Sequence, residues 1–252
     1  MERVKTLVIV NYHRPHTVDE ALSLAASPDA VILAGGTVVN ADRSAVHGDV
    51  VDLQALDIVG IEGVSGGVRI GAITTLGDIV TSELAPELIR DLAHREAPNT
   101  VRNAATIGGT IGARDPESQL LTGLLAFGAK VSVVHPDITA EHPIEALLED
   151  PGLLDRSLIT HVTIPSGGMA AASRTGRTPL DVPIVLAVAH RTSSGALTIA
   201  ASGVSDRPVV VDPAHLDDLE PPDDFRGSSD YRKAIAGVLV DRVIASVDGG
   251  GR

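Results

Sequence analysis

The chain of 252 residues contains no cysteine and no tryptophan, and it has only two phenylalanines and two tyrosines. Without cysteine, the chain can form no disulfide bond, no thiolate zinc site and no iron–sulfur cluster of its own. With so few aromatic rings, its core must consist of aliphatic side chains. A planar ligand would therefore find few rings on which to stack.

Positive charge is scarce as well. The chain has 20 lysines and arginines against 33 aspartates and glutamates, which gives a net charge of −13 and an isoelectric point of about 5.0. Nucleic acids and anionic membranes bind clustered positive charge, so neither is expected as a partner.

Long apolar runs are missing too. A membrane-spanning helix needs about 20 apolar residues, and no segment of the sequence approaches that length. Near the start, the apolar residues 7–10 end at Asn11, short of the apolar core of about 7–15 residues that an export signal requires. We therefore expect a soluble, cytoplasmic protein without a membrane span.

What the chain does have is a globular composition, with 44% hydrophobic and 21% charged residues. Short apolar runs alternate with segments of helical spacing, which predicts an α+β fold. The first unit spans about residues 1–54. It has predicted strands at 7–12, 31–34 and 49–53, and a helix that Thr17 caps.

A second unit is predicted over about 55–165, so that residues 1–165 form one domain. The expected strands are 58–61, 68–70, 130–134 and 158–164, and the expected helices are one capped by Thr74 or Thr75, one at 87–94 and one at 117–127. Pro116 is predicted as the first residue of the last helix. Residues 97–115 contain proline, asparagine and glycine with little periodicity, which predicts a long ordered loop of a kind that is often functional.

Residues 166–178 are small, polar and basic, which predicts either a mobile loop or a linker. Behind it, a small α+β domain is predicted over 179–252. Its expected strands are 184–190 and 197–204, and its expected helices are 212–219 and 229–247.

One catalytic motif occurs in the wrong context. Gly63-Val64-Ser65-Gly66-Gly67 matches the Gly-x-Ser-x-Gly pattern of hydrolase nucleophiles. Such a serine needs a strand before it and a helix after it, whereas the residues that follow continue as a strand. Residues 62–67 are therefore predicted as a hairpin turn. The common nucleotide-binding glycine motifs do not occur in the sequence.

Two other segments end in paired glycines and a threonine. The first, Leu33-Ala34-Gly35-Gly36-Thr37, follows a predicted buried strand, and the second ends in Gly108-Gly109-Thr110. Paired glycines let the backbone turn sharply and bring consecutive amides close to an anion. Two such loops that meet would hold a diphosphate with backbone amides and threonine hydroxyls.

Together with their flanks, these segments resemble the medium, FAD-binding subunit of the molybdenum hydroxylases, the family that includes carbon monoxide dehydrogenase and xanthine dehydrogenase. The resemblance covers essentially the whole chain in the right order. The segments that carry it are Tyr12-His13-Arg14-Pro15, 33–37, 70–76, 102–110, 116–129, 159–165 and 228–232. Residues 101–129 are the most specific part of it.

The resemblance implies a PCMH-type FAD-binding domain of two subdomains followed by a small C-terminal α+β domain. It implies FAD as the cofactor, with no catalytic acid, base or nucleophile and no metal ligand in this chain. The implied cofactor-binding residues are Ala34, Gly35, Gly36, Thr37, Val38, Thr106, Ile107, Gly108, Gly109, Thr110, Gln119 and Arg174.

The resemblance also implies partner chains. An iron–sulfur small subunit would relay electrons from a molybdopterin large subunit that oxidises the substrate. This chain would pass them to NAD, a quinone or oxygen. The lack of cysteine agrees with that division, because the clusters must then lie in another chain.

The chain departs from the family's pattern at three positions. Thr110, Gln119 and Ala172 stand where the family usually has asparagine, aspartate and an aromatic residue. Arg174 and Arg177 would either contact the flavin or form a solvated basic loop. The departures leave an alternative open, in which the chain is a flavin-deficient scaffold or assembly subunit of the same fold.

Overall fold

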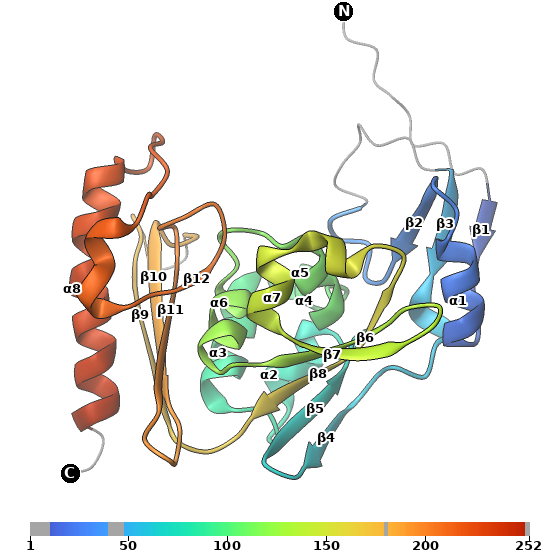
Figure 1. Cartoon of the computed structure of the whole chain (residues 1–252), viewed down its shortest axis with the longest axis horizontal. Coiled ribbons are helices and arrows are strands. Elements are labelled where there is room, and N and C mark those ends of the chain that lie inside the picture. Colours follow the sequence, from blue (N-terminus) through green and yellow to red (C-terminus); the bar gives the residue numbers. More distant parts are fainter. Residues whose placement is uncertain (1–10, 40–47, 179–180, 250–252) are drawn as a thin grey trace, which may run out of the picture.

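The computed structural model describes residues 11–39, 48–178 and 181–249. In these residues, three β-sheets follow one another along the long axis of the molecule (Figure 1). Helices and strands are both abundant, which agrees with the predicted α+β class. No helix in the described ranges is long and apolar enough to cross a membrane.

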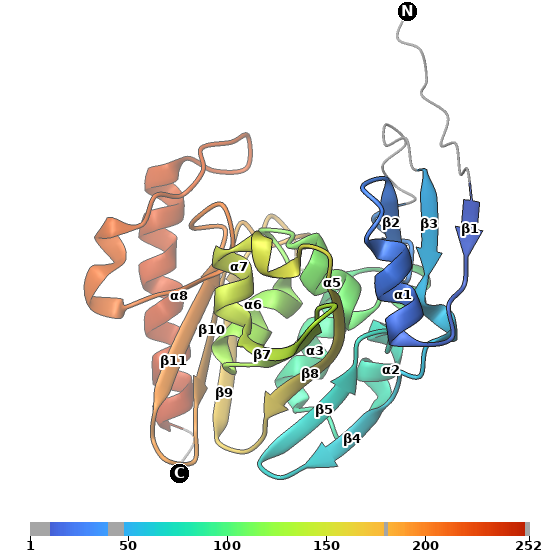
Figure 2. The same ribbon diagram turned by 45° about the vertical axis from the view of Figure 1, so that its right-hand side comes forward.

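The first sheet is parallel, with the strand order β1 (Asn11–His13), β3 (Asp49–Asp52), β2 (Ala30–Leu33). The helix α1 (Val18–Ala25) packs against this sheet (Figure 2). Thr17 caps α1 as predicted, because its hydroxyl accepts a hydrogen bond from the amide of Glu20 at 3.2 Å. The predicted strand 7–12 lies mostly outside the described residues.

The second sheet is antiparallel and has five strands. Their order is β4 (Ile61–Val64), β5 (Gly67–Gly71), β8 (Leu158–Pro165), β6 (Lys130–Val134), β7 (Thr139–Pro143). The hairpin between β4 and β5 turns at Gly66, whose φ of 80° favours glycine. The Gly-x-Ser-x-Gly match is therefore a turn between two strands, as predicted.

Helices of the second unit form a common core with this sheet. They are α2 (Leu76–Thr81), α3 (Glu87–Glu96), α6 (Gln119–Ala126) and α7 (Ile144–Glu149). Of the two predicted caps for α2, Thr75 is the one observed, in a reciprocal capping box with Asp78. All eight residues of α6 are buried.

The third sheet is also antiparallel, with the order β12 (Val209–Val210), β11 (Leu197–Ser202), β10 (Val185–Arg191), β9 (Met169–Thr175). The long helix α8 (Ser229–Gly249) covers its outer face (Figure 1). Side chains of β10 alternate between two cores, with Leu186 and Val188 in the core of α6, and Val185 and Ala187 in that of α8.

Several predicted elements differ in the structure. The loop predicted over 97–115 contains two short helices, α4 (Asn99–Arg102) and α5 (Ile107–Ala113). Pro116 is not helical, because Ser118 caps α6 and its hydroxyl accepts from the amide of Leu121 at 3.0 Å. The helix predicted over 212–219 is a 3₁₀ helix at Pro213–Asp218.

The segment 166–178 is not a free linker, because β9 is paired along its whole length with β10. A last domain that begins at 179 would exclude β9 from the sheet to which it belongs. The other predicted limits, a first domain over 1–165 with subdomains that meet near residue 54, stay predictions.

Candidate functional site

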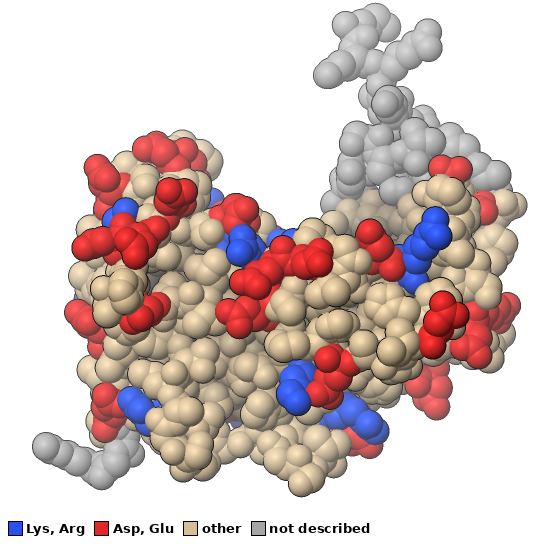
Figure 3. All heavy atoms as spheres, viewed as in Figure 1, with Lys and Arg blue, Asp and Glu red and all other residues tan. Residues whose placement is uncertain are grey.

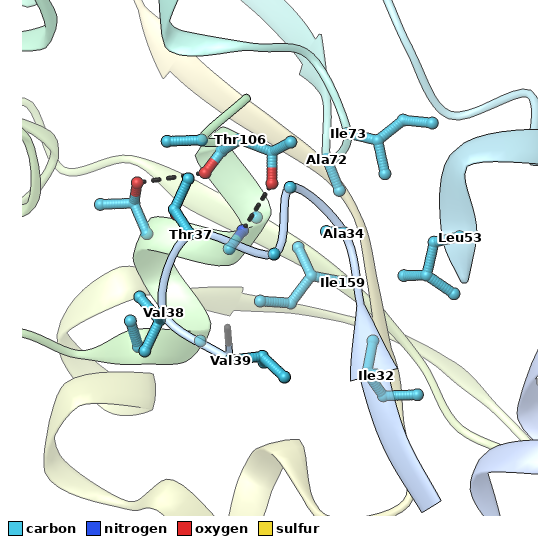
Figure 4. Close-up of a pocket in the computed structure, with 18 of the residues that line it drawn as sticks. Ile32, Ala34, Thr37, Val38, Val39, Leu53, Ala72, Ile73, Thr106 and Ile159 are labelled. Atoms are coloured by element: carbon cyan, nitrogen blue, oxygen red, sulfur yellow. Dashed lines mark hydrogen bonds between the residues drawn. The ribbon is translucent and has the colours of Figure 1, made fainter. Parts of the chain in front are cut away.

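A cavity of about 390 Å³ lies between the first sheet and the second unit. It brings together the two glycine segments that the sequence singled out. The first contributes Ala34, Gly35, Gly36, Thr37 and Val38, and the second contributes Thr106, Gly108, Gly109 and Thr110. In Figure 4 the loop with Thr37 faces the helix that starts after Thr106, and the aliphatic side chains of Ile32, Leu53 and Ile159 lie on another side.

The first glycine loop, Ala34–Val38, follows β2 directly. A Cβ atom on Gly35 would lie 1.8 Å from the carbonyl oxygen of Ala104, so only glycine permits this close approach of the two backbones. Gly36 has a φ of 70°, which a residue with a side chain rarely adopts. The side-chain amide of Gln54 donates to the carbonyl of Ala34 at 3.2 Å and fixes the start of the loop.

Backbone amides of the first loop remain available. Between Gly35 and Val38, no amide donates a hydrogen bond to another described residue, and the Thr37 hydroxyl has no described partner either. Consecutive free amides in a tight turn form an anion-binding concavity. The loop therefore supplies the type of donor that a diphosphate requires.

The second glycine segment differs, because its amides donate within the protein. The amides of Ile107 and Gly108 donate to the carbonyls of Thr74 and Ala72 at 3.1 and 2.8 Å. The amide of Gly109 donates to the Thr106 hydroxyl at 3.0 Å (Figure 4). The amide of Thr110 donates to the Thr106 carbonyl at 2.9 Å. This segment therefore forms a wall of the cavity rather than an array of free donors.

A third wall comes from the segment 154–159, which the sequence did not indicate as part of the site. Leu154, Leu158 and Ile159 supply apolar surface, and Ser157 lies among them. The Ser157 hydroxyl oxygen is buried and has no hydrogen-bond partner among the described residues. A buried hydroxyl of this kind is costly unless a ligand or water completes its bonds. No local motif marks Ser157, so the sequence alone offered no signal for it.

The described residues that line the cavity include no charged side chain, although the chain as a whole has a net charge of −13. From these residues a diphosphate would meet neutral donors and no repelling carboxylate. They include no aromatic ring either, and Ile32, Leu53, Ile73 and Ile159 supply apolar surface. The donor set thus fits a ligand with a diphosphate and apolar or planar ends.

Three predicted cofactor residues do not line the cavity. Ile107 is fully buried behind it. Gln119 is buried and accepts a hydrogen bond from Arg174 at 3.2 Å, while its amide group donates to the carbonyl of Arg95 at 2.9 Å. A contact of Gln119 or Arg174 with the cofactor stays a prediction.

Arg174 lies on the strand β9, so the expected solvated loop is wrong for this residue. Burial lowers the pKa of its guanidinium below the ordinary value, and the positive charge of the nearby Arg95 lowers it further. Ala172, which stands where the family has an aromatic residue, pairs with Val188 in the same sheet. No cluster of three or more potential metal ligands occurs in the described ranges.

Comparison with known families decides the class of the protein. Residues 8–167 match the family model described as the FAD binding domain in molybdopterin dehydrogenase. The chain belongs to this family. FAD is accordingly its cofactor, and the chain is a component of an oxidoreductase. The two glycine segments and the cavity all lie within the matched residues.

Relatives match this family member over nearly its full length. The uncharacterized protein YgfM of Escherichia coli K12 is 30% identical, and the alignment covers 92% of this chain and 94% of YgfM. The carbon monoxide dehydrogenase medium chain of Afipia carboxidovorans is 28% identical, with 93% of this chain and 95% of the relative covered.

Solved structures show the same fold. A carbon monoxide dehydrogenase chain from Hydrogenophaga pseudoflava superposes with a TM-score of 0.88 at 23% identity, over 96% of this chain and 98% of that one. A chain of quinoline 2-oxidoreductase from Pseudomonas putida 86 superposes with a TM-score of 0.84 at 22% identity, over 97% and 99%. This family member therefore has the same fold as these two chains.

Proposed function

We propose that the chain is the medium subunit of a cytoplasmic molybdenum hydroxylase and holds FAD in the cavity between its first two sheets. An iron–sulfur small subunit would deliver electrons that a molybdopterin large subunit takes from the substrate. The external acceptor would be NAD, a quinone or oxygen. The observation that supports this proposal best is the first glycine loop. Its amides donate to no other described residue, and the described lining of the cavity beside it carries no charged side chain.

The residues divide the work of holding the cofactor. The amides of Gly36, Thr37 and Val38 would donate to the diphosphate, with the Thr37 hydroxyl as a further donor. Gly108, Gly109 and Thr110 would close the opposite wall without donating amides. Bound FAD would supply the redox chemistry, since it accepts and releases one or two electrons. The chain's own residues bind and orient it, and none of them needs to act as an acid or base.

The alternative is a flavin-deficient scaffold subunit, and the environment of Gln119 is the observation that favours it. Gln119 offers no carboxylate, and both ends of its side chain are already bonded to Arg174 and to the Arg95 carbonyl. Ala172 offers no ring. If these positions matter for affinity, the cavity alone must retain the flavin.

Visible absorbance of the purified chain separates the two functions. The sequence has no tryptophan and two tyrosines, so absorbance at 280 nm is small and bound flavin stands out. We expect a yellow protein, or one that becomes yellow with added FAD and stays so after gel filtration. A chain that stays colourless after incubation with excess FAD would favour the scaffold alternative. Gly63→Ala, on an exposed strand with open space around it, is the matched control for substitutions of the cavity glycines.

A further inference from the structure

We propose that the turn Asp224–Gly227, called here the Phe225 turn, docks onto a partner protein. The phenyl ring would enter an apolar pocket on that partner, and basic side chains would surround the pocket. The surface lies in the C-terminal unit, outside the cavity and outside the matched FAD-binding residues 8–167.

Phe225 is unusually exposed for an aromatic side chain. Its exposed fraction is 87%, the highest among the large hydrophobic residues that the structure describes. The chain has two phenylalanines, and the other, Phe127, is buried and stacks on the ring of His190. Tyr231 is 43% exposed and packs over Gly227, where an added Cβ would lie 3.0 Å from the tyrosine ring. A second partly exposed aromatic ring thus packs against the turn that carries Phe225.

The turn that carries Phe225 is held firmly from inside. The backbones of Asp224 and Gly227 bond to each other in both directions, at 3.3 and 3.2 Å. Arg232 is fully buried, donates to the Asp224 carboxylate at 2.8 Å and contacts the carbonyl of Gly227 at 3.3 Å. The same guanidinium donates to the carbonyl of Ile184 at 2.6 Å, which ties the turn to the third sheet.

Arg226 anchors the other side of the turn. Its guanidinium forms ion pairs with Asp224 and with Glu117, the latter in the segment before α6. Its central carbon lies 6.0 Å from the centre of the Phe225 ring. A rigid turn loses little conformational entropy on association, and exposed, preorganised aromatic side chains are typical energetic centres of interfaces.

The charge around the turn selects the partner. The segment 212–230, which contains the turn, carries six exposed carboxylates: Asp212, Asp217, Asp218, Glu220, Asp223 and Asp230. Figure 3 shows acidic side chains gathered over the C-terminal unit. An anionic membrane, a nucleic acid or a second copy of this acidic chain would be repelled. A protein surface with lysines and arginines around an apolar pocket is complementary.

The identity of the partner rests on the proposed function, because the experiment uses the other chains of the proposed complex as candidate partners. We would measure binding of the full chain, with its FAD, to the co-expressed iron–sulfur and molybdopterin chains. Phe225→Ala is expected to raise the dissociation constant about 30-fold or more. Its flavin content and melting temperature should stay unchanged, since the side chain is exposed. The double variant Glu220→Lys, Asp223→Lys should weaken binding and reduce its dependence on salt.

Ile138→Ala is the matched control, because Ile138 is 63% exposed on a different unit; it should change binding less than about twofold. If Phe225→Ala binds as tightly as the unaltered chain, or if Ile138→Ala weakens binding as much as Phe225→Ala does, the docking surface is refuted. The proposed function is not affected by either result. A dimer of the isolated chain that Phe225→Ala dissociates would overturn it in favour of self-association. If the unaltered chain binds neither partner chain, the proposed function fails and the docking surface fails with it.

Discussion

Two segments of this protein share the letters Gly-Gly-Thr, line the same cavity and do different things. In the first loop, after β2, the amides from Gly35 to Val38 have no acceptor among the described residues. In the second, the amides from Ile107 to Thr110 all donate within the protein. The same motif therefore provides free donors in one place and a packed wall in the other.

Their surroundings explain the difference. The second segment is the first turn of α5, whose cap Thr106 also forms a bridge with Thr75. The segment between β5 and α2 thus provides acceptors for the first two amides of α5, namely the carbonyls of Thr74 and Ala72. The first loop leaves a parallel strand and approaches the backbone of Ala104 closely at Gly35. Substitutions in the two segments should therefore have effects of different size and kind.

The largest effect is expected for Gly35→Val, in the first loop. A side chain there collides with the Ala104 carbonyl, which lies 1.8 Å from the Cβ position. The loop must move away, so we expect complete loss of bound flavin and a decrease of about 1–3 kcal/mol in the free energy of unfolding. Absorbance after gel filtration and urea denaturation measure the two quantities. A variant that keeps its flavin would show that the loop does not hold the diphosphate.

Gly108→Asp tests the second segment. Its Cβ would lie 2.8 Å from the carbonyl oxygen of Ala72, and its carboxylate would be placed beside the cavity wall. We expect α5 to shift and the FAD dissociation constant to rise more than about tenfold. Gly63→Asp, in open space, controls for the added charge. Full flavin occupancy in Gly108→Asp would remove this segment from the site.

A matched pair of threonine variants compares the segments directly. The Thr37 hydroxyl has no described partner, whereas the Thr110 hydroxyl donates to the Thr106 carbonyl at 3.1 Å. Thr37→Val should weaken FAD binding about fivefold, the effect of losing one hydrogen bond to the ligand. Thr110→Val should change it less than about twofold. Fluorescence titration with FAD gives both constants, and the reverse order would refute the distinction drawn between the loops.

Ser157→Ala tests whether the third wall of the cavity, residues 154–159, bonds to the cofactor. Its hydroxyl is buried without a partner, so its removal should leave the FAD-free protein equally or more stable. If the hydroxyl bonds the cofactor, FAD binding weakens about two- to fivefold. Thermal melting with and without FAD measures both effects. An unchanged shift of the melting temperature by FAD would place Ser157 outside the cofactor contacts.

The smallest effect is expected for Glu96, the last residue of α3. Glu96 accepts from the amide of Leu120 at 2.9 Å, and burial raises the pKa of its carboxyl above the ordinary value. The folded state then holds the proton more tightly than the unfolded state. Stability should therefore fall as the pH rises from the ordinary glutamate pKa through the raised one. In Glu96→Gln this fall of stability with rising pH should be smaller than in the unaltered chain. An unchanged slope of urea stability against pH would contradict it.

Local patterns in the sequence predicted the parts of the fold that depend on local interactions. The Thr17 cap, the turn at Gly66 and the strand 130–134 follow from hydroxyl, glycine and β-branched residues at their expected positions. Elements fixed by distant contacts were missed. The helix α5 consists mostly of glycine and small residues with weak helical preference, and its first two amides donate to carbonyls of the segment between β5 and α2.

The same reasoning applies to β9 and to the site. β9 contains three alanines and little strand signal, so only its pairing with β10 makes it a strand. The sequence brought the two glycine segments forward as a site, and the structure places both on one cavity. Packing between distant residues decides whether the amides of these segments donate within the protein and whether the Ser157 hydroxyl finds a partner. No local sequence pattern encodes that packing.

The complete burial of α6 has a consequence for how the molecule unfolds. The helix packs on α3 on one side and on β10 and β11 on the other, so it belongs to the interior of two units at once. Neither unit can open alone without exposing its leucines to water. Amides of α6 and β10 should therefore exchange with solvent together, in a single cooperative event. The C-terminal sheet and the unit that carries the cavity therefore stabilise each other through α6, and neither unfolds independently of the other.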